Sequence, residues 1–397
     1  MASMLFRPAL TYGKRVSLEI PVNPHQNLPL WERYAHQFPI REHLTYLNHA
    51  AVAPLSKPAA DAMKHLADDC LNYGSLHYGE WLAVYDGLRK SAARLIGADP
   101  GEIALVKNTS EGILTVALGL DWRPADRIVA FREEFPANYF PWKRLEQKGI
   151  TVTWLSVTDP LERIEEACRG ARLLAISFVQ FLSGYRAPIH EIGEICQRNH
   201  CIFLVDAIQG LGAFPIDVRA CHIDALAADG HKWLMGPEGC AILYINQDLQ
   251  DHVDPIEFGW TNVEKYNDYA SRDMALRRDA GRYEPGTLNT IGCFGLMAAI
   301  DFLLEVGVGE IAPVILNATD KLAEGVQTRG YELFRQRTPD TASGIVSFRK
   351  SNLPAEQLVR TLRSRGIMAA PRAGWVRASP HFYISPDDIG RVLEALP

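Results

Sequence analysis

The sequence lacks an excess of positive charge. Its 41 Lys and Arg residues are outnumbered by 47 Asp and Glu residues, which gives a formal net charge of -6 at pH 7. Proteins that bind nucleic acids or anionic membranes usually present a basic surface. The composition therefore argues against both kinds of partner.

Long hydrophobic runs are also missing. The longest purely apolar stretches, such as 240–245, are far shorter than the roughly 20 residues that cross a bilayer. The N-terminal stretch 1–15 contains few apolar residues before Lys14 and Arg15, too few for the hydrophobic core of a signal peptide. We therefore expect a protein without a membrane span, located in the cytoplasm.

Cysteine is scarce and scattered. None of the cysteines stands at the close spacing of a metal-binding pair, and the twelve histidines show no metal-binding spacing either. We expect buried, reduced thiols, no disulfide framework and no catalytic metal ion. The seven cysteines are Cys70, Cys168, Cys196, Cys201, Cys221, Cys240 and Cys293.

The length of 397 residues exceeds the usual size of a single hydrophobic core, so we expect two domains. Strand and helix signals alternate from 103 to 245, which predicts right-handed crossovers and a mostly parallel sheet. We place an N-terminal arm at 1–45, packed on the small domain. A large domain follows at 46–292, and a small α+β domain at 293–397.

The strongest chemical signal lies between residues 201 and 239. A short apolar run at 202–205 is typical of a parallel strand buried on both faces, and it ends at Asp206. A second run, 223–228, ends close to Lys232. Open α/β sheets bind ligands at the carboxyl ends of their strands, so we expect this carboxylate and this amine to meet there. Such a pair suits pyridoxal 5'-phosphate (PLP), which has a pyridine nitrogen and an aldehyde.

Three segments of this region resemble the aminotransferase class V family of fold-type I PLP enzymes. They are 206–209 (DAIQ), 230–233 (GHKW) and 236–239 (GPEG), and the resemblance continues in order from about Tyr46 to the C-terminus. This family includes cysteine desulfurases, kynureninases and isopenicillin N epimerase-like enzymes. The resemblance implies an α/β fold with a mostly parallel sheet of the seven-stranded type, flanked by helices, and a small C-terminal α+β domain.

The resemblance also implies roles around the cofactor. Lys232 is expected to bond covalently to the aldehyde of PLP and, once released, to move the Cα proton of an amino acid. Asp206 is expected to keep the pyridine nitrogen protonated, because a nearby opposite charge favours the charged form. Gln209 is expected to donate to the 3'-oxygen, and His231 to contact the phosphate or the ring. Relatives often have a serine at the position of Asp229, so we expect this carboxylate to point away from the phosphate.

A phosphate cradle is expected where a strand at 103–106 meets the following helix. Asn108 as N-cap, with Glu111 three residues later, forms a variant capping box that leaves free N–H groups at the positive end of the helix. An ordinary capped helix would have the same sequence pattern. In the family this junction holds the PLP phosphate, which assigns Thr109 and Ser110 to phosphate binding.

Two further residues take their expected roles from the family. Phe135 stands where the family places the ring that stacks on the pyridine, although cysteine desulfurases have a histidine there; the alternative is a buried core residue. Thr287 lies in a segment that, in the family, reaches the phosphate of the other subunit. We therefore expect a homodimer with composite active sites.

Substrate binding is expected to involve two arginines and the segment 45–51. A guanidinium group can bind an α-carboxylate through two hydrogen bonds, with Arg372 the first choice and Arg377 the second; each could instead form a structural ion pair. Asn48 and His49 belong to a loop at the substrate pocket, although a hydrogen-bonded structural role for His49 is equally open.

Other pocket positions stay open between alternatives. Either Ser177 or Gln180 is expected near the cofactor's 3'-oxygen or the substrate. Trp142, Trp260 or Trp375 is expected to line the side-chain pocket.

The reaction follows from what is missing near Arg372. Cysteine desulfurases supply a mobile thiol beside the equivalent arginine, whereas this chain has the sequence RAGWV at 372–376 and its last cysteine is Cys293. We therefore expect an enzyme that is not a cysteine desulfurase, in which Lys232 catalyses transamination between an α-amino acid and a 2-oxo acid. The alternatives are a lyase that cleaves a Cβ–S or Cβ–C bond, an epimerase, or a binding module without activity.

Overall fold

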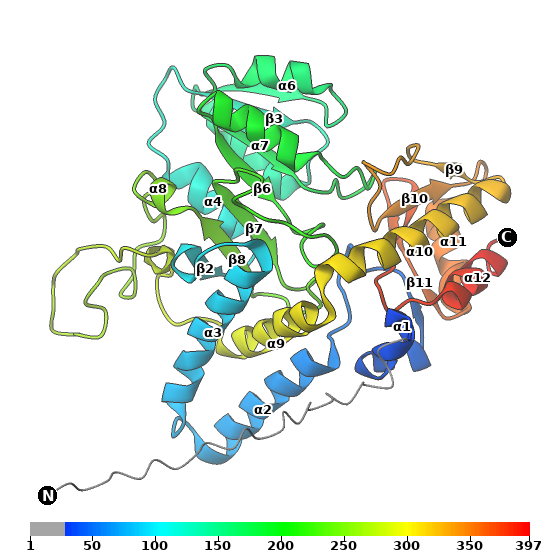
Figure 1. The fold of residues 1–397 in the computed structure, drawn as a ribbon, viewed down its shortest axis with the longest axis horizontal. Coiled ribbons are helices and arrows are strands. Elements are labelled where there is room, and N and C mark those ends of the chain that lie inside the picture. Colours follow the sequence, from blue (N-terminus) through cyan, green and yellow to red (C-terminus); the bar gives the residue numbers. More distant parts are fainter. Residues whose placement is uncertain (1–27) are drawn as a thin grey trace, which may run out of the picture.

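The protein was analysed as a computed structural model, and the structure describes residues 28–397 (Figure 1). The first 27 residues of the predicted N-terminal arm therefore lie outside the described residues. A large sheet with its helices forms one part of the molecule, and a smaller sheet with three helices forms the other (Figure 1).

The large sheet has seven strands and confirms the predicted fold class. Both pairings of β8 are antiparallel, whereas the other neighbouring strands pair in parallel. In spatial order the strands are β2 (Ile103–Val106), β8 (Ala241–Ile245), β7 (Ala225–Asp229), β6 (Ile202–Asp206), β5 (Leu173–Ser177), β3 (Arg127–Phe131) and β4 (Thr151–Leu155).

The central strands are apolar throughout because helices cover both faces of the sheet. Successive side chains alternate between the faces, so that Leu204 joins one hydrophobic core and Val205 the other. One face packs on α4 (Thr109–Gly119) and α5 (Phe140–Gln147). The other packs on α3 (Tyr78–Ile96), α6 (Leu161–Cys168), α7 (Ile189–Arg198) and α9 (Thr290–Val306).

The helix α9 belongs structurally to the large domain. It packs along α2 (Lys57–Tyr73) and α3, and the chain then turns at Gly307 so that α9 and α10 (Val308–Thr328) lie at 83° (Figure 1). The boundary predicted at 292/293 therefore falls inside a continuous helix. The positive φ of 88° at Gly307, which glycine adopts without strain, ends that helix.

The small domain contains an antiparallel sheet in the order β12 (Ala370–Arg372), β13 (Trp375–Ala378), β10 (Val346–Arg349), β9 (Glu332–Leu333). Its helices are α10, α11 (Ala355–Ser364) and α12 (Pro386–Glu394). The strand β13 ends at Ala378, close to Pro380, which has no N–H group with which to continue the ladder.

The described part of the N-terminal arm packs on the small domain. It contains α1 (Leu30–Arg33) and two short 3-10 helices, Ala35–Gln37 and Pro39–Glu42, and Phe38 stacks on Tyr383 at a centroid distance of 3.9 Å. Next, β1 (Thr45–Tyr46) pairs in parallel with β11 (Ile367–Met368). These contacts bring residues 30–46 beside the C-terminal part of the chain.

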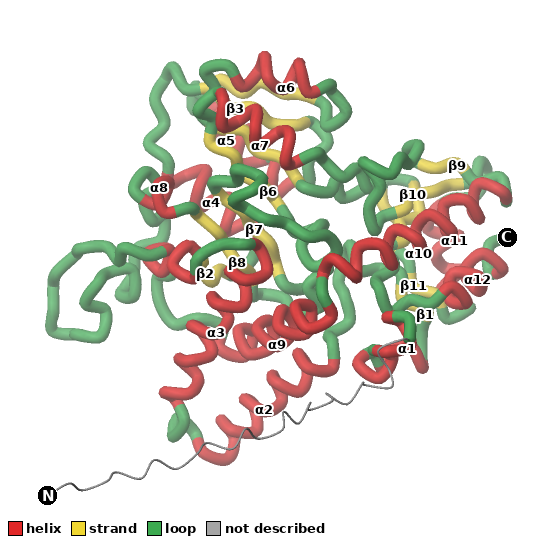
Figure 2. The backbone as a smooth tube through the Cα atoms, in the orientation of Figure 1, coloured by secondary structure: helices red, strands yellow, loops and turns green. Residues whose placement is uncertain are grey.

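Three further 3-10 helices and one short helix lie in the connections: Pro100–Glu102, Pro136–Asn138, Ala280–Tyr283 and α8 (Gln247–Gln250). Figure 2 shows that the connection between α8 and α9 is mostly loop and extends away from the sheet. Between residues 28 and 397, no single helix is long and apolar enough to cross a membrane, although α9 and α10 would pass as a bent pair.

Candidate active site

A cavity of about 410 Å³ lies at the carboxyl ends of β6 and β7. It collects most of the side chains that the sequence assigned to cofactor and substrate. Its lining includes Thr109, Ser110, Phe135, Phe181, Asp206, Gln209, Asp229, His231, Lys232, Arg372 and Arg377.

Asp206 is the last residue of β6 and is only 2% exposed. One of its carboxylate oxygens accepts a hydrogen bond from the N–H of Ile208 at 3.1 Å, and no cation lies within ion-pair distance among the described residues. Burial raises the pKa of Asp206 to about 6, against the effects of the Ile208 N–H and of Lys232. This carboxylate would be stabilised by a cation in the cavity, such as a protonated pyridine nitrogen.

Lys232 lies three residues after the end of β7, with its amine 5.7 Å from the centroid of the Phe135 ring. Within the described chain no carboxylate comes within ion-pair distance of this amine. Burial lowers the pKa of Lys232 to about 8; Asp206 opposes the decrease and Arg377 adds to it. A substantial fraction of the amine is therefore uncharged and nucleophilic near neutral pH.

Hydrogen bonds hold Gln209 in place. Its Nε2 donates to the carbonyl of Ala50 at 2.9 Å, and its Oε1 accepts from the indole N–H of Trp233 at 2.9 Å. One N–H of the amide is left over for a ligand. The orientation of Gln209 thus depends on the loop at Ala50, which also lines the cavity.

The end of the cavity at the N-terminus of α4 has the expected capping geometry. Asn108 Oδ1 accepts from the N–H of Glu111 at 2.9 Å, and the Glu111 carboxylate accepts from the N–H of Lys107 at 2.5 Å. Thr109 Oγ1 accepts from the N–H of Asp229 at 3.0 Å, so its own proton can be donated to an anion. Together with Ser110, these groups present hydrogen-bond donors to an anion at the positive end of the helix.

The sequence analysis expected the Asp229 side chain to point away from the phosphate, but in the structure it faces the cavity. Alternation along β7 places its side chain on the same face of the sheet as Ala227, which packs against Gly112 of α4. Asp229 therefore lines the cavity at the end beside the N-terminus of α4, and its Oδ1 lies 3.0 Å from His231 Nδ1.

Arg377, on β13, is 2% exposed and lacks an acidic partner within 4 Å in the described structure. Its Nη1 donates to the carbonyl of Phe181 at 2.7 Å, while its Nε is buried without any partner. Burial lowers the pKa of Arg377 to about 10, and the neighbouring charge of Arg372 adds to this decrease. A buried guanidinium of this kind is stabilised by a carboxylate ligand.

Arg372 also lines the cavity, but it is exposed and donates only to the adjacent carbonyl of Pro371, at 3.1 Å. The geometry therefore favours Arg377 for the substrate carboxylate, in place of Arg372, the first choice from the sequence.

Asn48 and His49 do not line the cavity. The ring of His49 is fully buried, with Nδ1 2.8 Å from the carbonyl of Ser379 and Nε2 2.8 Å from the hydroxyl of Tyr383. Burial lowers the pKa of His49 to about 4, which keeps the ring neutral. The structural alternative described above therefore accounts for His49. Asn48 forms a backbone bridge with the same residue, Ser379.

Thr287 is exposed and lies outside the cavity of its own chain, in a separate surface cavity of about 260 Å³ beside Glu111 and Gly239. Trp142 is fully buried in the core, and neither Trp260 nor Trp375 lines the candidate active site. The three tryptophan assignments are therefore not supported.

Neither Ser177 nor Gln180 lines the cavity either. Both are held by residues of the segment 133–134, which the sequence did not single out: the Ser177 hydroxyl donates to the Glu134 carboxylate, and Gln180 Nε2 donates to the Glu133 carbonyl at 2.6 Å. Burial raises the pKa of Glu134 to about 8. Because Ser177 pairs with Asp206 across the sheet, Glu134 supports the strand end that carries the cofactor carboxylate.

Phe181 was also missed. Its ring lies 5.3 Å from that of Phe135 in an edge-on arrangement, and it closes the same side of the cavity. It follows β5 within an irregular turn, so no periodic pattern indicated a role.

These groups fit PLP. The cavity offers an amine without a partner at Lys232, a buried carboxylate at Asp206, a ring at Phe135 and free donors at the start of α4. Asp229 is the one unfavourable group, and His231 lies at ion-pair distance from it. When bound here, PLP supplies an electron sink for negative charge that develops on the α-carbon of an amino acid.

The lowered pKa of Lys232 predicts how the apoprotein takes up PLP. Only the neutral amine attacks an aldehyde, so the rate of PLP incorporation should rise with pH and level off above about 8. Asp206 raises the pKa of Lys232, so Asp206→Asn should move the midpoint to lower pH. Stopped-flow absorbance measures the rate; a midpoint near the ordinary lysine value of 10.5, unmoved in the variant, would contradict the assignment.

Known proteins resemble the chain over most of its length. It is 31% identical over 385 residues to a probable cysteine desulfurase from Methanothermobacter thermautotrophicus, covering 90% of this chain and 94% of that protein. It is 30% identical over 382 residues to a probable cysteine desulfurase from Pyrococcus abyssi, with the same coverage. The apo structure of a cysteine desulfurase from Thermococcus onnurineus superposes with a TM-score of 0.84 at 28% identity, covering 91% of this chain and 96% of that one.

These relatives contradict the function predicted from the sequence. The exclusion of cysteine desulfurases rested on the missing thiol beside Arg372, and the preference for transamination with a 2-oxo acid rested on that thiol and on Phe135 in place of the desulfurase histidine. Proteins named as cysteine desulfurases nevertheless match this chain at 30 and 31% identity and share its fold. The absence of one loop cysteine is therefore too narrow a criterion for excluding this class.

The family itself is shown by a match along the chain. The sequence profile of the family described as aminotransferase class-V matches residues 45–383, which include every residue of the cavity lining. This chain therefore belongs to the aminotransferase class V family and is a PLP-dependent enzyme.

Proposed function

We propose that this enzyme removes sulfur from L-cysteine or a closely related amino acid. The observation that carries the amino acid part is the buried guanidinium of Arg377, whose Nε has no hydrogen-bond partner among the described residues, in the same cavity as the amine of Lys232. An α-carboxylate and an α-amino group are the two features that such a pair recognises. The sulfur part is supported by the relatives named as probable cysteine desulfurases.

Each residue has a separate task in this proposal. Arg377 binds the α-carboxylate and fixes the amino acid against the Phe181 turn. Lys232 moves the proton at Cα, since its pKa of about 8 suits both accepting and donating a proton. Asp206 holds a proton on the ring nitrogen of the cofactor. Phe135 covers one side of the site and excludes water.

The sulfur acceptor comes from solution in this proposal. All seven cysteines lie between residues 28 and 397, and none of them lines the cavity. A dissolved thiol RSH would attack the substrate sulfur, so that cysteine and RSH give alanine and the persulfide RSSH. The Cβ–S bond breaks, an S–S bond forms, and Cβ takes up a proton.

The test is a product analysis with L-cysteine and dithiothreitol. We expect alanine and sulfide in equal amounts, because dithiothreitol releases sulfide from its own persulfide as it closes to the cyclic disulfide. Pyruvate and ammonia in place of alanine would replace this proposal with β-elimination. A persulfide on any of the seven cysteines during turnover would overturn the external acceptor.

We further propose that the active enzyme is a homodimer in the cytoplasm. The exposed position of Thr287, outside the cavity of its own chain, supports a contribution to the cofactor site of a second copy. The family match and the amino acid substrate are independent of this assembly.

Complementation tests the composite site. In a mixed dimer of a Lys232→Ala chain and a Thr287→Ala chain, one of the two sites contains both intact residues. We therefore expect up to about half of the wild-type activity from the purified mixed dimer, and up to about a quarter from a statistical mixture of the two chains, each parent being weak. A confirmed mixed dimer with no recovery would show that each site is built from one chain.

A further inference from the structure

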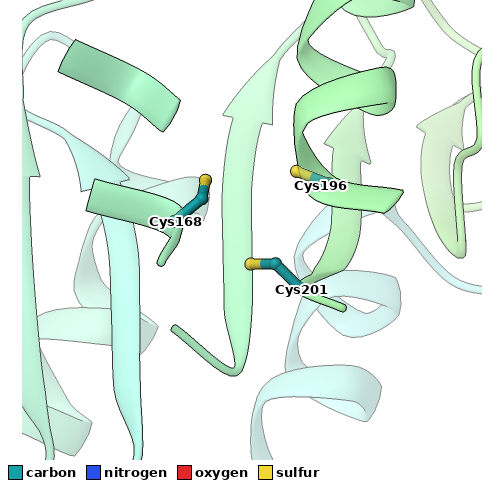
Figure 3. Close-up of side chains that lie close together, drawn as sticks. All are labelled: Cys168, Cys196 and Cys201. Atoms are coloured by element: carbon teal, nitrogen blue, oxygen red, sulfur yellow. The ribbon is translucent and has the colours of Figure 1, made fainter. Parts of the chain in front are cut away.

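Three cysteines that are distant in sequence meet in the core of the large domain, away from the active-site cavity (Figure 3). Cys168 ends α6, Cys196 lies in the last turn of α7, and Cys201 directly precedes β6. Their Sγ atoms all lie within 4.8 Å of one another. Figure 3 shows the side chains of Cys196 and Cys201 pointing toward the side where Cys168 lies.

The surroundings of the three sulfurs are dry. Cys168, Cys196 and Cys201 are 0%, 1% and 4% exposed and belong to the hydrophobic core. Among the described residues, no histidine or carboxylate shares the cluster. Any ligand of this site would therefore be held by sulfur alone.

The thiols interact with one another. Each thiol lies close enough to the other two for a single ion to contact all three sulfurs. An incoming cation would displace protons from these thiols as it binds. The other close pair, Cys240 and Cys293 at 3.9 Å, has no third sulfur and serves as a comparison within the chain.

We propose that Cys168, Cys196 and Cys201 form a binding site for one thiophilic metal ion. Thiolate ligands select soft ions such as Zn²⁺ and Cu⁺. Metal–sulfur bonds of about 2.3 Å in a three-coordinate, trigonal arrangement place the sulfurs about 4.0 Å apart. Sulfurs that already lie within 4.8 Å need only a small rearrangement to reach that spacing.

Charge favours the divalent ion. Three thiolates carry a charge of -3, so Zn²⁺ leaves a smaller net charge in this apolar region than Cu⁺ does. The ion would link the ends of α6 and α7 to the start of β6, which are also joined here by side-chain packing, by the Arg198–Glu165 ion pair and by the hydrogen bond from the Cys201 N–H to the Cys196 carbonyl. Its role is therefore structural, and independent of the chemistry proposed for Lys232.

The experiment uses the full-length, fully reduced holoenzyme. Equilibrium dialysis against Zn²⁺, and separately against Cu⁺, followed by elemental analysis, should give one ion per chain. Binding should be lost in Cys168→Ala and in Cys196→Ala but retained in the matched controls Cys240→Ala and Cys70→Ser. Cys240 is a buried thiol outside the cluster, and Cys70 is an exposed one. The ion that binds at one per chain, Zn²⁺ or Cu⁺, is then the metal of this site.

Thermal unfolding gives a second readout. An ion that binds the native state should raise the melting temperature of the wild type by several degrees at saturation, and should not do so in the cluster variants. If the variants fail to fold, X-ray absorption of the metal-loaded wild type should show three sulfur neighbours. Substoichiometric binding of both ions, binding that survives loss of Cys168, fewer than three sulfur neighbours, or a disulfide within the cluster of the purified protein would overturn the site.

Discussion

Lys232→Ala will reduce turnover of L-cysteine by at least about 10⁴-fold, the largest effect of any single substitution in this chain. The variant loses the only amine in the cavity lining, and with it both the covalent anchor of PLP and the group that moves the Cα proton. Alanine, the amino acid product of the proposed reaction, should fall below detection in a fixed-time assay.

The fate of the cofactor distinguishes loss of chemistry from loss of folding. Borohydride should fix PLP to the wild-type chain but not to Lys232→Ala, although free PLP can still enter the cavity. Lys64→Ala provides a matched control, because Lys64 is an exposed lysine in an ion pair with Asp61 on α2. A reducible bond that persists in Lys232→Ala would place the anchor at another lysine.

The position of Lys232 and Asp206 was predictable because strand ends follow from short apolar runs. The runs at 202–205 and 223–228 lie within or close to β6 and β7, and parallel pairing then brings their carboxyl ends together. This inference needs only local patterns and a general rule of topology.

Long-range packing explains what the sequence did not reveal. His49 is a residue type that often lines ligand pockets. Its partners Ser379 and Tyr383 lie more than 300 positions away in the sequence, so only the folded small domain shows that the ring is enclosed. Glu134 was missed for the same reason, since its contact with Ser177 joins two separate strand ends. The hydrophobic periodicity of the sequence predicts neither contact.

The orientation of Asp229 was predicted wrongly for a more local reason. Its orientation could have been derived from the alternation of β7, because the residue two positions earlier faces α4. The expectation that it points away came from the charge of the phosphate instead. In the structure this carboxylate lines the cavity instead, with its Oδ1 3.0 Å from His231 Nδ1.

Arg377→Leu should lower kcat/KM for L-cysteine by about 10²- to 10³-fold, because removal of one partner from a buried charge pair typically costs about 2–5 kcal/mol. Leucine suits the apolar surroundings of the site, so the variant should still fold. Arg372→Leu is the matched control; its exposed guanidinium should contribute tenfold or less.

A comparison of L-cysteine with cysteamine isolates the contact responsible. Cysteamine lacks only the carboxylate, so the wild-type enzyme should strongly prefer L-cysteine, and Arg377→Leu should lose most of that preference while its rate with cysteamine changes little. Arg377→Lys should fall between the two, since it keeps the charge without the forked geometry. If Arg372→Leu were instead the variant that loses discrimination, the carboxylate would bind at the exposed arginine, and the buried guanidinium of Arg377 would serve only to hold the Phe181 turn.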